Sequence, residues 1–149
     1  MARQYGDAIK HKMENVSVAF EVLENGKKPS AANKQVSFHM IYDIKMDFTR
    51  KARLLAEGCR TPNPVTSTYA GVVSRESARI SFTYTSLNGL DVLAADVQNA
   101  FLQAPCSDKY FTFCGPEFGS EFIGKLAIIV RAAYGLKSEG AYFWDHLRD

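Results

Sequence analysis

The chain has 149 residues, of which 46% are hydrophobic and 12% are aromatic. This length and composition indicate one globular domain, or part of one, with enough apolar side chains for a core, and they exclude a disordered chain. The net charge of +2 is too small to indicate nucleic-acid binding by itself, so any basic surface must be local. No stretch approaches the roughly 18 consecutive apolar residues of a membrane span, and the N-terminus lacks the apolar core of a signal peptide.

The cysteines and histidines do not suggest a metal site. Cys59, Cys106 and Cys114 are odd in number and contain no C-x-x-C pair, and the three histidines are scattered. A zinc site is therefore not expected, and idle or buried thiols in a reducing, intracellular compartment are the default.

The first part of the chain predicts a helix, a strand and a hairpin. Residues 2–15 are charged and modestly helical, and residues 16–23 alternate apolar and polar side chains like a half-buried strand. A turn and loop at 24–29 follows, because Asn-Gly readily adopts positive φ. Residues 36–46 form a second extended run, and a turn at 47–49 leads into a returning strand at 50–56.

The predicted hairpin has an unusually basic end, formed by Lys45, Arg50, Lys51 and Arg53. Side chains two apart on a strand point the same way, so Lys51 and Arg53 share a face. Two cations so placed suit a triphosphate or a nucleic-acid backbone. The alternative is a solvated strand whose lysines protect a sheet edge, and the pattern taken alone favours this alternative.

The middle of the chain predicts a loop, a helix and a short buried strand. Residues 57–69 contain glycine and prolines and indicate a loop. Residues 72–87 fit both strand alternation and a helical face, but Ser74 as a cap and Asn88-Gly89 as a stop favour a helix. The uncharged apolar run at 92–95 predicts a buried strand that ends at Asp96.

Asp96 has two interpretations. A carboxylate at the end of a buried strand is costly unless a cation or hydrogen-bond donors compensate it, which suggests a ligand site. Alternatively, Asp96 caps the following turn or helix through its side-chain oxygen. The residues of this stretch alone leave the two interpretations open.

The last third of the chain predicts two strands and a helix. Residues 103–109 form a loop, 110–114 a short strand, 115–119 a turn and 125–131 an apolar strand. Ser138 can cap a final helix at 139–147.

The chain contains, in order, the segments FTRKARL at 48–54, YAGVVSR at 69–75, DVQNAFL at 96–102 and IVRAAYGLKS at 129–138. These four blocks resemble, in order and at similar spacing, the reverse transcriptases of copia-type retrotransposons. The segment DVQNAFL at 96–102 resembles the first catalytic motif of that family. The segment FTRKARL at 48–54 resembles the basic fingers strand, and YAGVVSR at 69–75 the approach to the first palm helix. The segment IVRAAYGLKS at 129–138 resembles the stretch before the next palm helix. The resemblance covers residues 35–149, whereas residues 1–34, a predicted helix and strand, match less distinctly.

The resemblance implies an α+β fold that comprises the fingers and an incomplete palm, with antiparallel strands and helices on one face. It implies RNA-directed DNA polymerase activity in an intact parent polyprotein, located in the cytoplasm or in virus-like particles. Two Mg²⁺ ions would promote attack of a primer 3′-hydroxyl on a dNTP held against an RNA or DNA template-primer. Asp96 would bridge the metals, and the carbonyl oxygen of Val97 would reach one of them.

The resemblance also implies roles for the residues around the nucleotide. Phe101 would be the aromatic gate beneath the sugar, and its alternative is a plain core aromatic. Gln98 would lie under the nucleotide, and Lys51 and Arg53, with Lys45 assisting, would hold the triphosphate. Gly135 and Lys137 would contact the nucleotide or the template.

One departure limits what this chain is expected to do alone. The aromatic-x-Asp-Asp turn that supplies the other metal carboxylates in the family does not occur in these 149 residues. Asp91 lies at an odd separation from Asp96, so on a strand their side chains would face opposite ways. We therefore expect weak or absent Mg²⁺ binding, no polymerisation by this chain alone, and an open sheet edge that favours self-association or a partner chain.

Two further hypotheses remain open beside a reverse transcriptase fragment. The first is a non-catalytic module that binds nucleic acid or a nucleotide through the basic fingers strand. The second is an interaction module in which Asp96 is only a cap.

Overall fold

The computed structural model describes residues 2–64 and 68–149. Within this part of the chain the strands form two sheets, and the protein is of mixed α+β type. The predicted loop at 57–69 includes residues 65–67, which lie outside the described residues. No helix of the described part is long and apolar enough to cross a membrane.

The larger sheet has the strand order β1-β6-β5-β2. Its strands are β1 (Phe20–Val22), β2 (Lys34–Gln35), β5 (Tyr110–Phe113) and β6 (Leu126–Ile129). The β1–β6 and β5–β6 pairs are antiparallel, but β2 pairs with β5 in parallel. The strands are therefore mostly antiparallel, as expected, and the β2–β5 pair is the exception, because the long connection through 36–109 returns the chain beside β2 in the same direction.

The smaller sheet is the predicted hairpin. Strand β3 (Phe38–Ile44) pairs antiparallel with β4 (Arg50–Ala56), and Ile41 lies opposite Arg53. The bounds of β4 are those predicted. Ala52, Leu54 and Ala56 are buried while Lys51 and Arg53 are exposed, so the alternation that predicted the strand also predicted its faces correctly.

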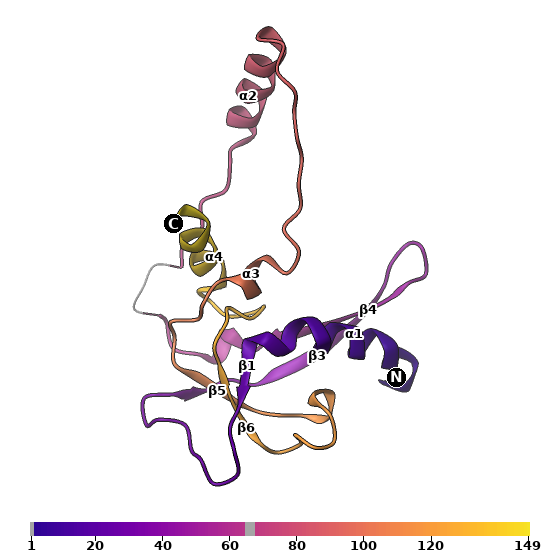
Figure 1. The fold of residues 1–149 in the computed structure, drawn as a ribbon, viewed down its shortest axis with the longest axis vertical. Helices are drawn as coiled ribbons and strands as arrows, with labels where there is room; N and C mark the ends of the chain where they lie inside the picture. The colour runs from indigo at the N-terminus through magenta and orange to yellow at the C-terminus, as the bar shows by residue number, and fades with distance from the viewer. Residues whose placement is uncertain (1, 65–67) are drawn as a thin grey trace.

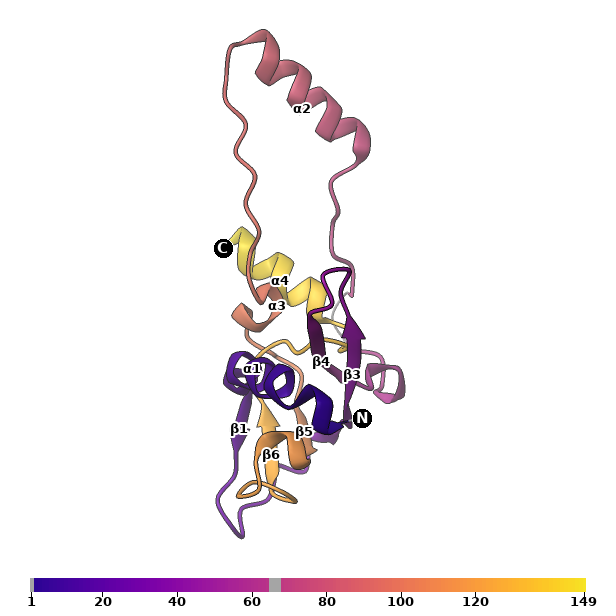
Figure 2. The same cartoon turned by 90° about the vertical axis from the view of Figure 1, so that its right-hand side faces the viewer.

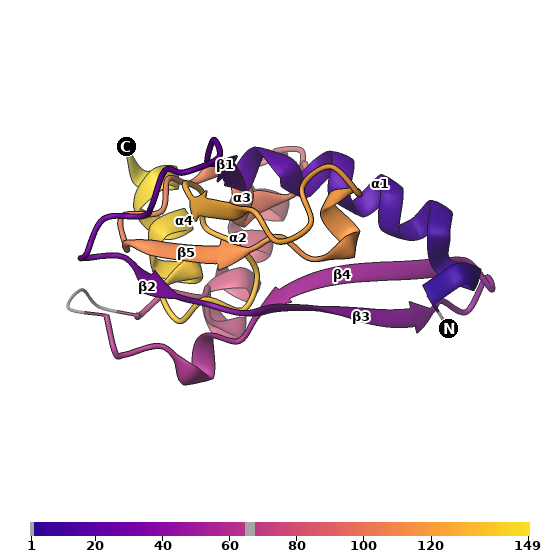
Figure 3. The same ribbon diagram turned by 90° about the horizontal axis from the view of Figure 1, so that it is seen from below.

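Helix α1 (Gly6–Val16) lies along β4, as Figure 3 shows. Val16 from its last turn packs with Ala19, Leu54 and Leu102 in one buried cluster. A second cluster, around Val36, Tyr110 and Ile129, joins the larger sheet to the segment at 132–136. The strand predicted at 16–23 is shorter in the structure, where β1 spans only Phe20–Val22. Its first residues finish α1 and form a 3-10 turn, so that Val16 and Ala19 reach the core.

Helix α2 (Arg75–Leu87) stands away from the body on two extended arms, as Figures 1 and 2 show. The helix prediction at 72–87 is confirmed, including its cap, because Ser74 Oγ accepts a hydrogen bond from the Ser77 N–H at 3.0 Å. None of the residues of α2 is buried. The expectation that the helices cover one face of a sheet therefore fails for α2.

The predicted buried strand at 92–95 is wrong. Residues 90–97 form an extended, exposed arm that belongs to neither sheet, and Leu93 is 94% exposed. A buried strand needs a neighbouring strand to take its backbone hydrogen bonds, and no described strand lies beside this arm. Asp91 and Asp96 therefore do not lie on opposite faces of one strand.

The chain returns to the body through α3 (Ala100–Gln103) and ends in α4 (Glu139–Arg148). These two helices pack together, with the Phe101 and Phe143 rings 5.9 Å apart. The helix at 139–147 is confirmed, but Ser138 does not cap it. The Ser138 hydroxyl instead donates to Asp108 Oδ2 at 2.5 Å, because the buried serine faces the loop before β5.

Candidate functional site

The structure brings Asp96 and the basic end of the hairpin to one cavity. This cavity, of about 560 Å³, is called the basic cavity below, and three segments line it: α1, the β3–β4 hairpin and residues 96–99. Its lining residues are Ala8, His11, Lys12, Asn15, Lys45, Thr49, Arg50, Lys51, Ala52, Asp96, Gln98 and Asn99. A volume of this size falls within the range of about 300–1,000 Å³ typical of small-molecule sites.

The hairpin forms the first wall. The turn between its strands is closed by a hydrogen bond from the Lys45 N–H to the Thr49 carbonyl oxygen, at 3.0 Å. Asp47 Oδ1 accepts from the Thr49 N–H, also at 3.0 Å, and the hydrogen bonds from Thr49 lower the pKa of Asp47. This turn sets Lys45, Arg50 and Lys51 around the mouth of the basic cavity.

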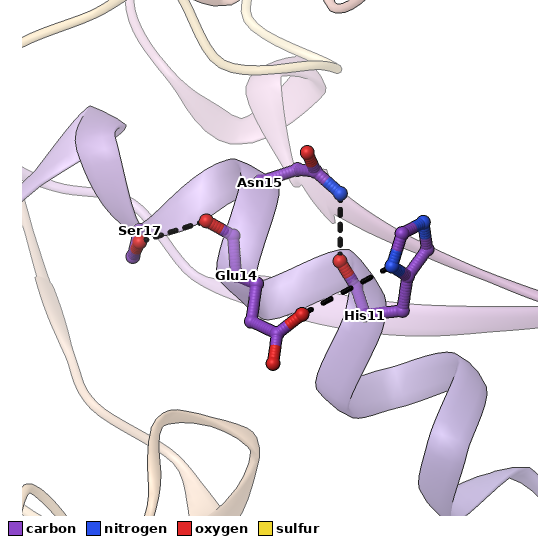
Figure 4. A network of polar contacts seen from close by, with 4 residues as sticks. All are labelled: His11, Glu14, Asn15 and Ser17. Atoms are coloured by element: carbon purple, nitrogen blue, oxygen red, sulfur yellow. Dashed lines mark hydrogen bonds and ion pairs between the residues drawn. The ribbon is translucent and has the colours of Figure 1, made fainter.

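Helix α1 forms the second wall, through His11, Lys12 and Asn15. Figure 4 shows the polar contacts that fix this face: Asn15 Nδ2 donates to the His11 carbonyl oxygen at 2.8 Å. His11 Nδ1 lies 4.0 Å from Glu14 Oε2, and both side chains are exposed. Such an exposed pair is weak, so it does not prevent the imidazole from contacting a ligand in the basic cavity.

Lys12 is the most constrained of the cations in the basic cavity. Its Nζ lies 4.8 Å from the centroid of the Tyr134 ring, within the range of a cation–π contact. Burial lowers the pKa of Lys12, and the positive charges of Lys51 and Arg53 lower it further. Lys12 on α1 is therefore close enough to Lys51 and Arg53 on β4 for electrostatic repulsion between them.

Positive charge dominates the lining of the basic cavity. Lys12, Lys45, Arg50 and Lys51 are cationic, whereas Asp96 is the one carboxylate among the described lining residues. None of these four cations forms an ion pair with a described carboxylate. Arg53, beside the basic cavity, has only a weak partner, Asp43 Oδ2 at 4.0 Å. An uncompensated cluster of this kind favours an anion.

Residues 96–99 form the third wall. Asn99 adopts a left-handed conformation (φ 51°) and turns the chain into α3. Gln103 Nε2 donates to the Gln98 carbonyl oxygen at 3.1 Å, which holds this turn. Asp96 is exposed and caps no helix, because Asn99 precedes α3 and makes no side-chain cap hydrogen bond. Val97 follows Asp96 and is 45% exposed, but it does not line the basic cavity.

Phe101 is half-buried and does not line the basic cavity. Its ring meets the Tyr134 ring edge to face, with centroids 5.2 Å apart. Tyr134 also contacts Lys12, whose ammonium group lies above its ring. Burial raises the pKa of Tyr134, and the negative charges of Glu139 and Asp96 raise it further. Phe101 therefore contacts the ring over which Lys12 lies.

Gly135 and Lys137 lie outside the basic cavity. The Gly135 N–H donates to Glu139 Oε2 at 2.6 Å. Lys137 Nζ donates to the Thr61 carbonyl oxygen at 2.6 Å and to Asn63 Oδ1 at 3.1 Å. Both residues are engaged within the protein, so the structure does not bring them together with Asp96.

The residues present do not fit a resident magnesium ion. Mg²⁺ requires several oxygen ligands or phosphates, and the cations around Asp96 repel a divalent cation. The described residues contain no group of three or more histidine, cysteine, aspartate or glutamate side chains that could hold a metal.

The sequence interpretation missed the contribution of α1. Ala8, His11, Lys12 and Asn15 are spaced three and four apart, which puts them on one face of a helix. That signal was present in the sequence. What the sequence could not give is that this face lies over β4 and not over solvent.

Comparison of the chain with protein-family profiles, with curated proteins and with solved structures found no match.

Proposed function

We propose that the basic cavity binds phosphate groups of a nucleotide or of a nucleic acid. The observation that carries this proposal is that the basic hairpin end and Asp96, far apart in the sequence, line one cavity with a large excess of positive charge. Lysine and arginine side chains that are not engaged in ion pairs can provide charge-assisted hydrogen bonds to phosphate oxygens.

The proposal extends to the lineage of the chain. The four sequence blocks that resemble a copia-type reverse transcriptase include both Asp96 and the strand that carries Lys51 and Arg53. We infer that the chain represents the fingers and part of the palm of such a polymerase. In this interpretation Lys51, Arg53 and Lys45 hold the triphosphate, and Asp96 would hold Mg²⁺ only together with nucleotide phosphates and further carboxylates.

Polymerase activity is proposed for an intact parent and not for this chain alone. The 149 residues contain no adjacent pair of aspartates, and a single carboxylate binds Mg²⁺ poorly. A primer-extension assay with Mg²⁺ tests this. Incorporation by the purified chain that is abolished by Asp96→Asn would contradict it.

A second candidate function is that of a non-catalytic binder of nucleic acid or a nucleotide. It is favoured by the ratio of four lining cations to one carboxylate, which suits phosphate better than metal chemistry. It shares the phosphate site with the first proposal and differs only in having no polymerising parent.

The phosphate site is tested by affinity and by its salt dependence. Fluorescence anisotropy measures binding of a labelled single-stranded oligonucleotide and competition by a dNTP. We expect affinity to fall steeply with salt, and Lys51→Ala with Arg53→Ala to weaken binding by about tenfold or more. The control is Lys10→Ala with Lys28→Ala, which removes the same charge from exposed positions outside the basic cavity. Equal affinities of the two double variants would overturn the proposal.

A further inference from the structure

Lys12 belongs to the part of the chain that the resemblance covers least, yet it lies in the basic cavity. It comes from α1, opposite the hairpin, and lines the same space as Lys51 and Asp96. It is the only lysine of α1 that does so, because Lys10 is exposed and outside the lining. The N-terminal helix is thus a wall of the site as well as a support for β4.

The side chain of Lys12 is held in place by packing against the protein. The residue is half-buried, and its ammonium group sits 4.8 Å from the centroid of the Tyr134 ring. Tyr134 is itself held edge to face by Phe101. A lysine fixed in this way has lost much of its rotamer freedom before a ligand binds, so binding costs less entropy.

The charge of Lys12 is not neutralised by an ion pair with any described residue. No described carboxylate forms an ion pair with it, and the charges that act on it most are the cations Lys51 and Arg53. Bringing a third cation to two others raises the free energy of the folded state unless an anion compensates it. Burial further disfavours the charged form, as the lowered pKa of Lys12 reflects.

We propose that Lys12 is a phosphate-binding residue that clamps a nucleotide polyphosphate from α1, opposite Lys51 and Arg53 on β4. This inference rests on the proposed phosphate site and adds a phosphate-binding cation from α1 and the ligand class. A polyphosphate carries several negative charges within a few ångströms, so it can contact cations from both walls at once. The cavity volume of about 560 Å³ suits a nucleotide rather than a duplex.

The test is calorimetric titration of the chain with inorganic tripolyphosphate and with a dNTP, each in turn. Lys12→Met keeps an unbranched apolar side chain and removes the charge, whereas Lys12→Arg keeps a charge. We expect Lys12→Met to weaken both ligands by about tenfold and Lys12→Arg to stay within about threefold of the native chain. Lys10→Met is the matched control on the same helix, and thermal melting shows that each variant folds.

The outcomes separate this inference from the proposed site. If Lys12→Met binds both ligands like the native chain while Lys51→Met with Arg53→Met binds them weakly, Lys12 is not a ligand and the phosphate site stands. If the double variant also binds like the native chain, the proposed site is wrong and the inference fails with it. If Lys12→Met and Lys10→Met weaken binding equally, the effect is one of net charge, and the assignment to Lys12 is again wrong. Loss with dNTP but not with tripolyphosphate would show a contact to the base or sugar and contradict a phosphate clamp.

Discussion

Gly58 and Gly135 lie in direct backbone contact, so that a Cβ on Gly58 would overlap the carbonyl oxygen of Gly135. Next to this contact the Ala56 N–H donates to the Tyr134 carbonyl oxygen at 2.7 Å. Together they attach the end of β4 to the segment that presents Tyr134. The strand that carries Lys51 and Arg53 is therefore joined at its C-terminal end to the segment of the aromatic ring that Lys12 contacts.

This contact predicts that Gly58→Ala is strongly destabilising. The added methyl group meets backbone atoms of Gly135 and Leu136 that cannot move independently. We expect a loss of about 3 kcal/mol or more in the free energy of unfolding, measured by urea denaturation. Gly6→Ala is the control, because a Cβ there meets nothing within 4 Å and the position lies in α1. A Gly58→Ala variant as stable as Gly6→Ala would refute the close contact.

Glu139 predicts a pH dependence of stability. Burial raises the pKa of its carboxyl to about 7 from 4.5, although the Gly135 N–H opposes the shift. Because the folded-state pKa is the higher one, folding favours the protonated form. The stabilisation is present in full below about pH 4.5 and is lost as the pH rises through about 7.

Glu139→Gln removes this titration. We expect its free energy of unfolding to change less than that of the native chain between about pH 4.5 and 7. Urea denaturation at a series of pH values measures the difference. Glu21→Gln, at an exposed position of β1, is the control and should keep the native slope. An unchanged slope in Glu139→Gln would assign the pH dependence to other groups.

Phe48 predicts a stabilising substitution. It has a φ of 62° in the hairpin turn and is 87% exposed, so it has a strained backbone and little burial to offset it. Phe48→Gly relieves the strain, and we expect a gain of about 1 kcal/mol, seen as a raised melting temperature. Phe48→Ala keeps the strain and serves as the comparison. A lower melting temperature for Phe48→Gly than for Phe48→Ala would contradict a strained turn.

The apolar face of α2 predicts self-association. Ile80 and Leu87 are 70% and 80% exposed on one face of a helix that contributes nothing to the core. Exposed apolar faces of this kind promote association. Ile80→Ser with Leu87→Ser should weaken association by roughly tenfold or more, measured by sedimentation equilibrium. Thr85→Ser, on another face of α2, should leave it unchanged, and a native chain that stays monomeric at high concentration would contradict the prediction.

Local patterns predicted the hairpin well, because every signal that defines it lies within it. The alternation at 50–56 sets the buried and exposed faces of β4, and Asp47 supplies the turn hydrogen bond. The helix at 75–87 was predictable for the same reason: Ser74 caps it and Asn88-Gly89 ends it. The signals that define both elements are local in the sequence.

The strand at 92–95 could not be predicted in this way. An apolar run is compatible with a buried strand only where a neighbouring strand accepts its hydrogen bonds, and that requirement is not visible in the run itself. Similarly, the spacing of His11, Lys12 and Asn15 predicts a helix face, but only the packing of α1 on β4 puts that face in the basic cavity. The sequence predicted that Asp96 and the cations of the hairpin form one site. It did not predict that α1 forms a second wall of that site.

The most direct test of the phosphate site is to map by amide NMR which residues respond to inorganic tripolyphosphate. We predict chemical-shift changes at Lys12 and Asn15 in α1, at Lys51 in β4 and at Gln98. A second cavity, of about 350 Å³ near Lys34 and Lys109, is also lined by lysines and provides the internal comparison. Saturable changes confined to the basic cavity would support the account, whereas changes centred on Lys34 and Lys109, or none at all, would contradict it.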